Sequence, residues 1–306
     1  MSCEVLTSSS SRRRRAKRGV FLSSFLPLLL GGWIATVCTK NAVVGFPIPG
    51  NIDNNSGLPP PLLPEDPEAM IRQASLAIRS ALQDGQIHRQ TIRLPLSESM
   101  YASKEESFVA DRAIGWQGGP QETFRCLSPM AKQLLKDVVG GNDSSGLAPK
   151  LQEQILLDFD GSSLLNAQSP LGALKDGIGL IQPNTDKYYM DLIQTLENDF
   201  SDSPGKAKRL FVLINPAWRD ASSFGIFQTK FATEQILDRY ETTYAIDQFI
   251  VKGNKLSLLR AWPCDWCVYY TPLPQPGSAT KPPPRLLGTF AERPEYAQIE
   301  ALTQTG

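Results

Sequence analysis

The stretch Arg209-Leu-Phe-Val-Leu-Ile214, which is followed directly by Asn215-Pro216, decides the fold class. An uninterrupted apolar run of this length predicts a buried strand, and the Asn-Pro pair ends it because proline cannot donate to a β ladder. Buried strands of this kind belong to sheets that are covered by helices. Open α/β sheets place their ligands at the carboxyl ends of strands, so the residues after Ile214 are candidates for a binding site.

Helical and strand patterns alternate around this strand. Upstream, the periodicity predicts helices over 67–84, 124–139 and 186–200, and strands over 87–96 and 154–159. Downstream come a helix over 233–239, a hairpin of 244–251 and 255–262 around Lys252-Gly253-Asn254, strands over 267–271 and 286–290, and a closing helix over 294–302. The order predicts an α/β fold with a mixed sheet flanked by helices and an antiparallel C-terminal hairpin region.

The chain is expected to have three parts. Residues 1–46 combine the basic run Arg12-Arg13-Arg14-Arg15 with an apolar stretch over 20–38, which predicts a targeting presequence. The alternatives are a retained membrane anchor, a bipartite presequence cut before Phe46, and a twin-arginine signal. A Pro-rich linker is expected over 47–64, and a single α/β domain over 65–306.

The charge balance argues against a nucleic-acid partner. The chain has 31 basic and 31 acidic residues, but residues 1–46 contain seven of the basic residues and one of the acidic ones. The remainder has 24 basic and 30 acidic residues, whereas binding to phosphate backbones requires a basic face. Because His88 is the single histidine, a multi-histidine metal site is impossible. We expect no metal and no cofactor.

Asp158-Phe159-Asp160-Gly161-Ser162, at the end of the predicted strand over 154–159, is the strongest catalytic pattern. It resembles the nucleophile loop of haloacid-dehalogenase-type phosphatases. That resemblance implies a Mg²⁺-dependent phosphohydrolase in which Asp158 attacks phosphorus and Asp160 acts as acid and base. The paired acidic motif that should follow at another strand end is missing, and a plain Asp-Gly turn explains the same residues.

Cys264-Asp265-Trp266-Cys267 is a C-x-x-C sequence, which suggests thiol-redox chemistry. The second cysteine runs into a predicted strand, so no helix N-terminus lowers a thiol pKa as in thioredoxin-like sites. Zinc would need two further ligands from Cys126 and His88, which are far away in sequence. Two buried residues beside large aromatic side chains are the simpler interpretation.

A polar and aromatic cleft is the third candidate site. Strand ends bring polar groups to one edge of an α/β sheet, and tryptophans follow the predicted strands. The cleft residues are Asp160, Gly161, Asn215, Trp218, Trp262 and Trp266. Turn chemistry and packing account for the same pattern without any ligand.

Several short segments together resemble a domain of unknown function from plastids and cyanobacteria, the low-photosystem-II-accumulation type, over about residues 65–303. The segments are Pro67 to Met70, Asp158 to Ser163, Leu210 to Pro216, Gly253 to Leu256, and Arg260 to Pro263 with Trp266. The resemblance implies a plastid location in the stroma or at the thylakoid, and a role in assembling or maintaining photosystem II. It also implies protein partners, such as photosystem II subunits or assembly factors, and peripheral association with the thylakoid membrane. It implies no catalytic residue.

The first hypothesis is therefore a plastid protein of unknown biochemical activity that acts as a non-enzymatic factor for photosystem II. The Mg²⁺-dependent phosphohydrolase with Asp158 and Asp160, and the thiol-redox protein with Cys264 and Cys267, are the alternatives.

Overall fold

The computed structural model describes residues 58–96, 119–140, 147–157, 159–201, 209–225, 228–272 and 282–303. The predicted presequence, the first part of the predicted linker, and Asp158 lie outside the described residues. No helix within the described ranges combines the length and the apolar character needed to cross a bilayer.

The strands of the described residues form one nine-stranded sheet in the order β2-β3-β4-β5-β1-β6-β7-β8-β9. Strands β4, β5, β1 and β6 run parallel, and the pairs on either side of this group are antiparallel. The predicted fold class, including the antiparallel C-terminal part, is confirmed. The strands are β1 (Arg89–Arg93), β2 (Lys150–Leu157), β3 (Ser162–Gln168), β4 (Gly177–Ile181), β5 (Leu210–Ile214), β6 (Glu241–Val251), β7 (Asn254–Ala261), β8 (Trp266–Thr271) and β9 (Arg285–Phe290).

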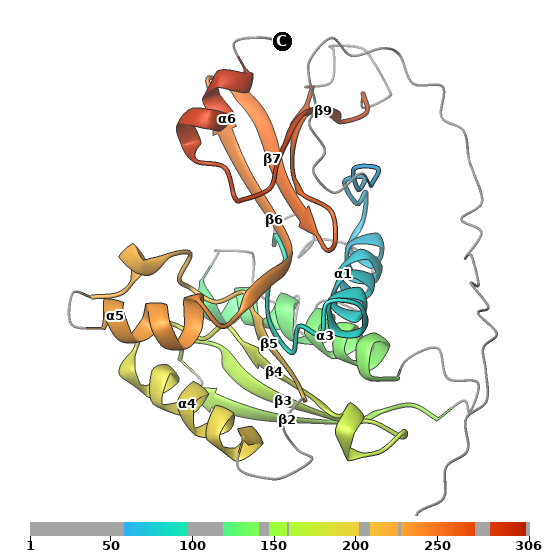
Figure 1. Ribbon diagram of the computed structural model, residues 1–306, viewed down its shortest axis with the longest axis vertical. Helices are drawn as coiled ribbons and strands as arrows, with labels where there is room; N and C mark the ends of the chain where they lie inside the picture. The colour runs from blue at the N-terminus through green and yellow to red at the C-terminus, as the bar shows by residue number, and fades with distance from the viewer. Residues whose placement is uncertain are drawn as a thin grey trace, which may run out of the picture. The chain divides into compact units, whose positions relative to one another are not determined.

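Helices cover both faces of the sheet, with α1 and α3 on one side and α4 and α5 on the other (Figure 1). The alternation in β5 serves both layers: Val212 packs toward α1 and α3, and Phe211 toward α4. A third cluster lies between the C-terminal strands and α6. The helices are α1 (Pro67–Gln83), α3 (Pro120–Gly140), α4 (Lys187–Ser201), α5 (Thr229–Ala232) and α6 (Tyr296–Leu302), with short turns η2 (Ala173–Lys175), η3 (Ala221–Ser223) and η4 (Thr233–Leu237).

Helix α1 begins where the sequence predicts. The Asp66 side chain accepts a hydrogen bond from the backbone N–H of Ala69 at 2.6 Å, and Pro67 occupies the first helical position. The described end of the Pro-rich segment already contacts the domain. Gln73 donates to the carbonyl oxygen of Leu62 at 2.9 Å, Tyr269 donates to that of Pro61, and Leu63 packs against the core.

Three local predictions are wrong. The strand predicted as buried over 154–159 is the edge strand β2, in which Ile155 is 48% exposed. The helix predicted over 124–139 begins earlier, at Pro120, and Pro129 lies inside this continuous helix α3. The helix predicted over 233–239 begins at Thr229 and continues as the π-type turn η4.

Strands β3 and β4 are not evident from the sequence. Strand β4 contains two glycines, which disfavour strands, yet the packing requires at least one of them. A Cβ atom on Gly179 would lie 2.8 Å from Leu135 Cδ1 of α3 and 3.1 Å from Ile214 Cδ1. The glycine therefore lets α3 approach the sheet closely, a tertiary reason that no local pattern reveals.

Candidate functional site

The carboxyl ends of the parallel strands form the candidate site. Strands β4 and β5 each end in an amide residue with left-handed backbone, Gln182 with φ of +50° and Asn215 with φ of +48°. Asn215 Oδ1 accepts from the N–H of Leu94 at 2.7 Å, and its Nδ2 donates to the Leu94 carbonyl at 2.7 Å. Asn215 thereby pairs with the backbone just after β1, which fixes the two strand ends relative to each other.

A cavity of about 700 Å³ opens at this edge. Its size is that of a small-ligand or peptide site. The lining combines apolar side chains with polar ones, four of which are amides. Strand ends and loops contribute Arg93, Asp160, Gln182, Asn184 and Asn215, and strand β6 contributes Gln248.

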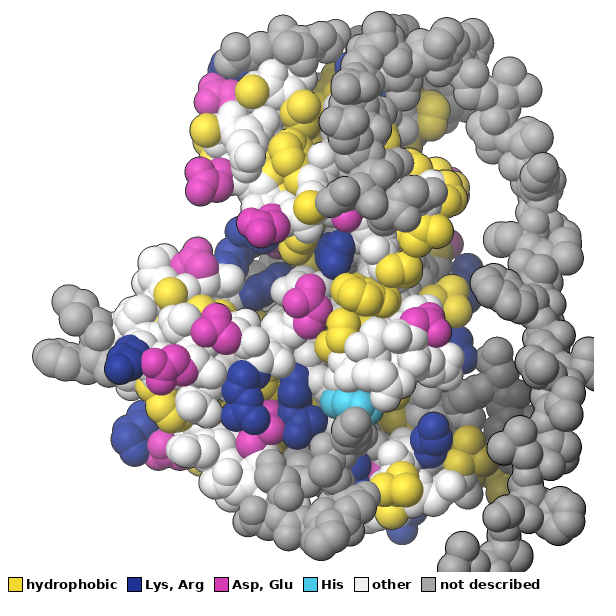
Figure 2. Space-filling view, viewed as in Figure 1, with side chains coloured by type: hydrophobic (Ala, Val, Ile, Leu, Met, Phe, Trp, Pro, Cys, Tyr) yellow, Lys and Arg dark blue, Asp and Glu magenta, His cyan; other side chains and the backbone are white. Residues whose placement is uncertain are grey.

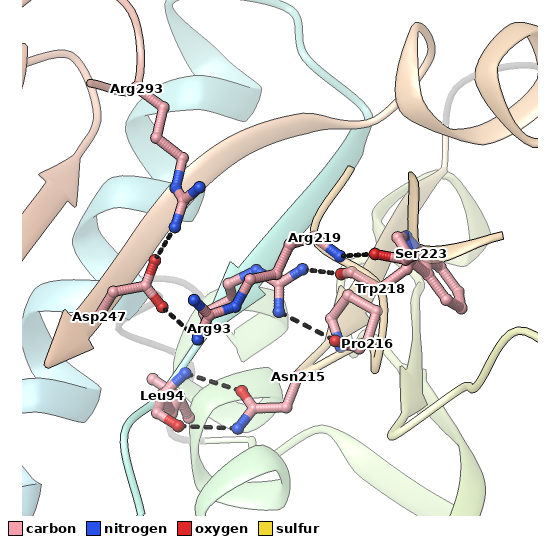
Figure 3. A network of polar contacts seen from close by, with 9 residues as sticks. All are labelled: Arg93, Leu94, Asn215, Pro216, Trp218, Arg219, Ser223, Asp247 and Arg293. Carbon is pink, nitrogen blue, oxygen red and sulfur yellow. Dashed lines mark hydrogen bonds and ion pairs between the residues drawn. The ribbon is translucent and has the colours of Figure 1, made fainter. Parts of the chain in front are cut away.

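Arg93, at the end of β1, lines this cavity. Its guanidinium donates to the carbonyl of Pro216 at 2.9 Å and to that of Trp218 (Figure 3). Burial lowers the pKa of Arg93 to about 10, the Asp247 charge opposes that shift, and the Arg219 and Arg293 charges add to it. The group still carries its charge at neutral pH.

Asp247 in β6 is the buried carboxylate among these arginines, with 7% of its surface exposed. One oxygen lies 2.8 Å from an Arg293 nitrogen and the other 3.5 Å from an Arg219 nitrogen (Figure 3). Two guanidinium groups therefore pair with one buried carboxylate, whose charge also acts on Arg93. Elsewhere on the face shown in Figure 2, basic and acidic side chains are interspersed.

Asp160 lies at the opposite side of the cavity, in the β2–β3 turn. Its Oδ2 accepts from the Tyr189 hydroxyl at 2.5 Å and from Asn184 Nδ2 at 3.2 Å. The Tyr189 hydroxyl also lies 2.5 Å from the Ser162 hydroxyl. Burial, followed by the bond to Asp160, raises the pKa of Tyr189 above its usual range, so this phenol stays protonated.

Two acceptors in the cavity wall are buried and have no hydrogen-bond partner among the described residues. They are Asp160 Oδ1 and Gln182 Oε1. Buried acceptors without a donor cost about 1–3 kcal/mol each. These two atoms can therefore accept hydrogen bonds from water or from a bound group.

Of the two carboxylates that the Mg²⁺ hypothesis requires, one lies at the cavity. Asp160 faces it, and Asp158 lies outside the described residues. No group of three or more His, Cys, Asp and Glu in the described part of the chain lies close enough to hold a metal ion. The acidic pair follows an edge strand of an antiparallel hairpin, and Asp160-Gly161 forms its turn.

The predicted cleft residues separate into several places. Asp160 and Asn215 line the large cavity, and Gly161 lies in a small hollow beside Phe124 of α3. Trp218 and Trp266 line a second cavity of about 300 Å³. Trp262 lines none of these cavities in the described chain; its ring lies 5.6 Å from the Arg260 guanidinium. The tryptophans thus form no common rim with Asp160.

The two cysteines of the C-x-x-C sequence are free thiols, with Cys267 buried and Cys264 half-buried. Burial raises the pKa of Cys267 to about 12 and also raises the pKa of Cys264. Redox-active thiols need the opposite shift, because the thiolate is the reactive form.

Sequence reasoning missed Arg93, Arg219, Asp247 and Arg293. These residues come from β1, the loop after β5, β6 and the loop after β9, so no local motif connects them. The one usable signal is position, because Arg93 lies near the end of a predicted strand and Arg219 follows the strand end at Asn215.

The comparisons with known proteins assign the domain. The comparison with curated proteins found no match. The family described as a domain of unknown function, DUF1995, matches residues 64–301, which include every helix and strand described above except the last residue of α6. The chain therefore belongs to the DUF1995 family.

Proposed function

We propose that this domain is a non-enzymatic binding module that receives an extended polypeptide segment of a partner protein in the cavity at the carboxyl edge of the sheet. The observation that carries the proposal is the pair of buried acceptors, Gln182 Oε1 and Asp160 Oδ1. Backbone N–H groups of an extended segment are donors of the kind that these two atoms lack.

The polar side chains of the cavity support binding rather than turnover. Asn215 uses both atoms of its amide on the Leu94 backbone, and Arg93 donates to two backbone carbonyls. Such groups are held in position by the fold and are not poised to exchange protons with a substrate. The pairing of Asn215 with Leu94 is also an internal example of how amide side chains bind a peptide group.

The proposed setting is the plastid, in the stroma or at the thylakoid surface, with photosystem II subunits or assembly factors as partners. The presequence pattern of residues 1–46 and the resemblance to the low-photosystem-II-accumulation type support it. A C-terminal fluorescent tag and N-terminal sequencing of the mature protein test the location. Intact chain in the cytosol, with its first 46 residues still attached, would contradict it.

A steric variant tests the cavity. Ala217 lines it and is exposed, so Ala217→Trp should fill space without disturbing the core. Ala173→Trp, on the exposed turn η2, is the matched control. Tagged wild type and control should co-purify with photosystem II assembly intermediates, and Ala217→Trp should not. Equal recovery of assembly intermediates with all three proteins would contradict binding in this cavity.

A second pair of variants tests the role of the buried acceptor Gln182 Oε1. Gln182→Leu removes the unpaired acceptor, and Gln194→Leu makes the same change on the exposed face of α4. Capture of assembly intermediates should fall about tenfold for the first and stay unchanged for the second.

The phosphohydrolase and thiol-redox hypotheses stay predictions with their own tests. Phosphatase activity that requires Mg²⁺ and disappears in Asp160→Asn would support the phosphohydrolase hypothesis. Reversible oxidation of Cys264 and Cys267 to a disulfide in the folded protein would revive the second.

A further inference from the structure

Three guanidinium groups gather where the large cavity meets the smaller one. Arg93 and Arg219 line both cavities, and Arg293 lines the smaller one. Asp247 is the buried carboxylate between them, and the exposed carboxylate of Asp220 also borders the smaller cavity. Three positive and two negative groups leave an excess positive charge in a recess of about 300 Å³.

The cluster is held together by bonds that leave donors unused. Asp247 forms an ion pair with one nitrogen of Arg293 and another with one nitrogen of Arg219. Asp220 accepts hydrogen bonds from the backbone N–H and the hydroxyl group of Ser222. Each guanidinium offers five N–H donors in a planar fork that suits oxyanions. In the described chain, Arg93 has no carboxylate within ion-pair distance and bonds only to backbone carbonyls. The like charges of Arg219 and Arg293 act on Arg93, so an added anion would relieve their repulsion.

The recess also offers neutral donors. Thr91 and Thr242 line it from β1 and β6, and hydroxyl groups commonly complete oxyanion sites. Trp218 closes one wall. The side chains of Arg219 and Arg293 are 59% and 42% exposed, so a group that arrives from solvent can reach both of them.

We propose that the arginine cluster of Arg93, Arg219 and Arg293 around Asp247 binds an oxyanion carried by the partner segment, so that the cavity selects anionic polypeptides. The proposal rests on the proposed function, because the segment that occupies the large cavity brings the anion to its edge. The oxyanion is either a carboxylate, from an acidic side chain or a chain terminus, or the phosphate of a phosphorylated residue. Both are recognised by the same fork of donors.

The experiment is a titration of the purified full chain with inorganic phosphate and, separately, with acetate, at constant ionic strength maintained with NaCl. Calorimetry should report a dissociation constant of about 1 mM or lower for the preferred oxyanion, which two or three charge-assisted hydrogen bonds can supply. Preference for phosphate assigns a phosphorylated partner, and preference for acetate assigns a carboxylate.

Variants that should change the affinity for the oxyanion in opposite directions distinguish an effect on the site from a loss of folding. Arg219→Gln and Arg293→Gln should each weaken binding of the preferred oxyanion by about tenfold or more. Asp247→Asn removes the competing carboxylate and should strengthen it severalfold, a change that a merely unfolded variant cannot give. Arg72→Gln, on the exposed face of α1, is the matched control and should bind like wild type.

Two results overturn the inference. One is no saturable binding of either oxyanion, and the other is binding that Arg219→Gln and Arg293→Gln leave unchanged. If this happens while Ala217→Trp still abolishes partner capture, the cavity remains the binding site and only the anion is lost. If partner capture is also insensitive to Ala217→Trp, the proposed function falls with it.

Discussion

Two hairpin turns of this protein each contain a glycine with positive φ, but their surroundings differ. The β2–β3 turn contains Asp160-Gly161 and the β6–β7 turn contains Lys252-Gly253, and both glycines have positive φ, +64° and +80°. A Cβ atom on Gly161 would lie 2.6 Å from Phe124 Cβ and 2.8 Å from the Pro120 carbonyl, whereas one on Gly253 would meet nothing within 4 Å. A turn motif therefore becomes part of a site only through the elements that pack against it.

Substitution of the two glycines should give the largest difference between the two turns. Gly161→Ala should cost about 2–4 kcal/mol, because left-handed strain adds to a clash with the start of α3. Gly253→Ala should cost only about 1 kcal/mol of strain. Urea denaturation of the two variants measures the difference. Equal losses would mean that α3 does not press on the β2–β3 turn.

Asn215→Ala tests how far the cavity side depends on side chains that bond to the backbone. The change leaves the N–H and the carbonyl of Leu94 without their partners, and it should cost about 2–3 kcal/mol. Asn254→Ala, at the start of β7 beside the exposed turn, makes the same substitution as a control and should cost less than about 1 kcal/mol. Both values come from denaturant midpoints at unchanged slope.

Tyr189→Phe tests the contacts of Asp160 in the β2–β3 turn. It removes the hydroxyl that contacts both Ser162 and Asp160, and it should lower stability by about 1–2 kcal/mol. Tyr188→Phe changes the neighbouring, half-exposed ring of the same helix and should be nearly neutral. A neutral result for both would show that the Asp160 turn does not need the phenol.

The C-terminal half offers a test at alkaline pH. Folded Cys267, with its pKa near 12, keeps its proton at pH values where the unfolded thiol, with a pKa near 8.5, has lost it. Its contribution to stability is thus complete below about pH 8.5 and declines as pH rises toward 12. Cys267→Ala should flatten, but not abolish, the alkaline loss of stability, because buried tyrosines contribute to it as well. Rapid reaction of Cys267 with a thiol reagent in the folded state at pH 8 would contradict this.

The sequence predicts the elements whose patterns are local. Helix α1, with its Asp66 cap, and the β6–β7 hairpin, with its Lys-Gly-Asn turn, are predicted within a few residues. Strand β3 (Ser162–Gln168) escapes because its polar residues hide its pairing with β4, and β4 escapes because its glycines serve the packing of α3.

For the candidate site, the sequence predicts the residues at the strand ends but not the arginine cluster beside them. Asp160 and Asn215 do face one cavity, as strand-end logic indicates. The arginine cluster could not be predicted, because Arg93, Arg219 and Arg293 come together only through the order of strands in the sheet. Trp262 and Trp266 pack in other clusters and do not line this cavity in the described chain.

The position of β1 has a consequence for biosynthesis. This strand is made first, yet its two neighbours in the sheet, β5 and β6, are made more than a hundred residues later, as the pairing of Arg89 with Phe211 shows. The ribosome must therefore release the chain through about residue 245 before the middle of the sheet can close. Until then Ile92 and Leu94 remain open to wrong contacts, so the nascent chain should be a client of chaperones that shield apolar segments.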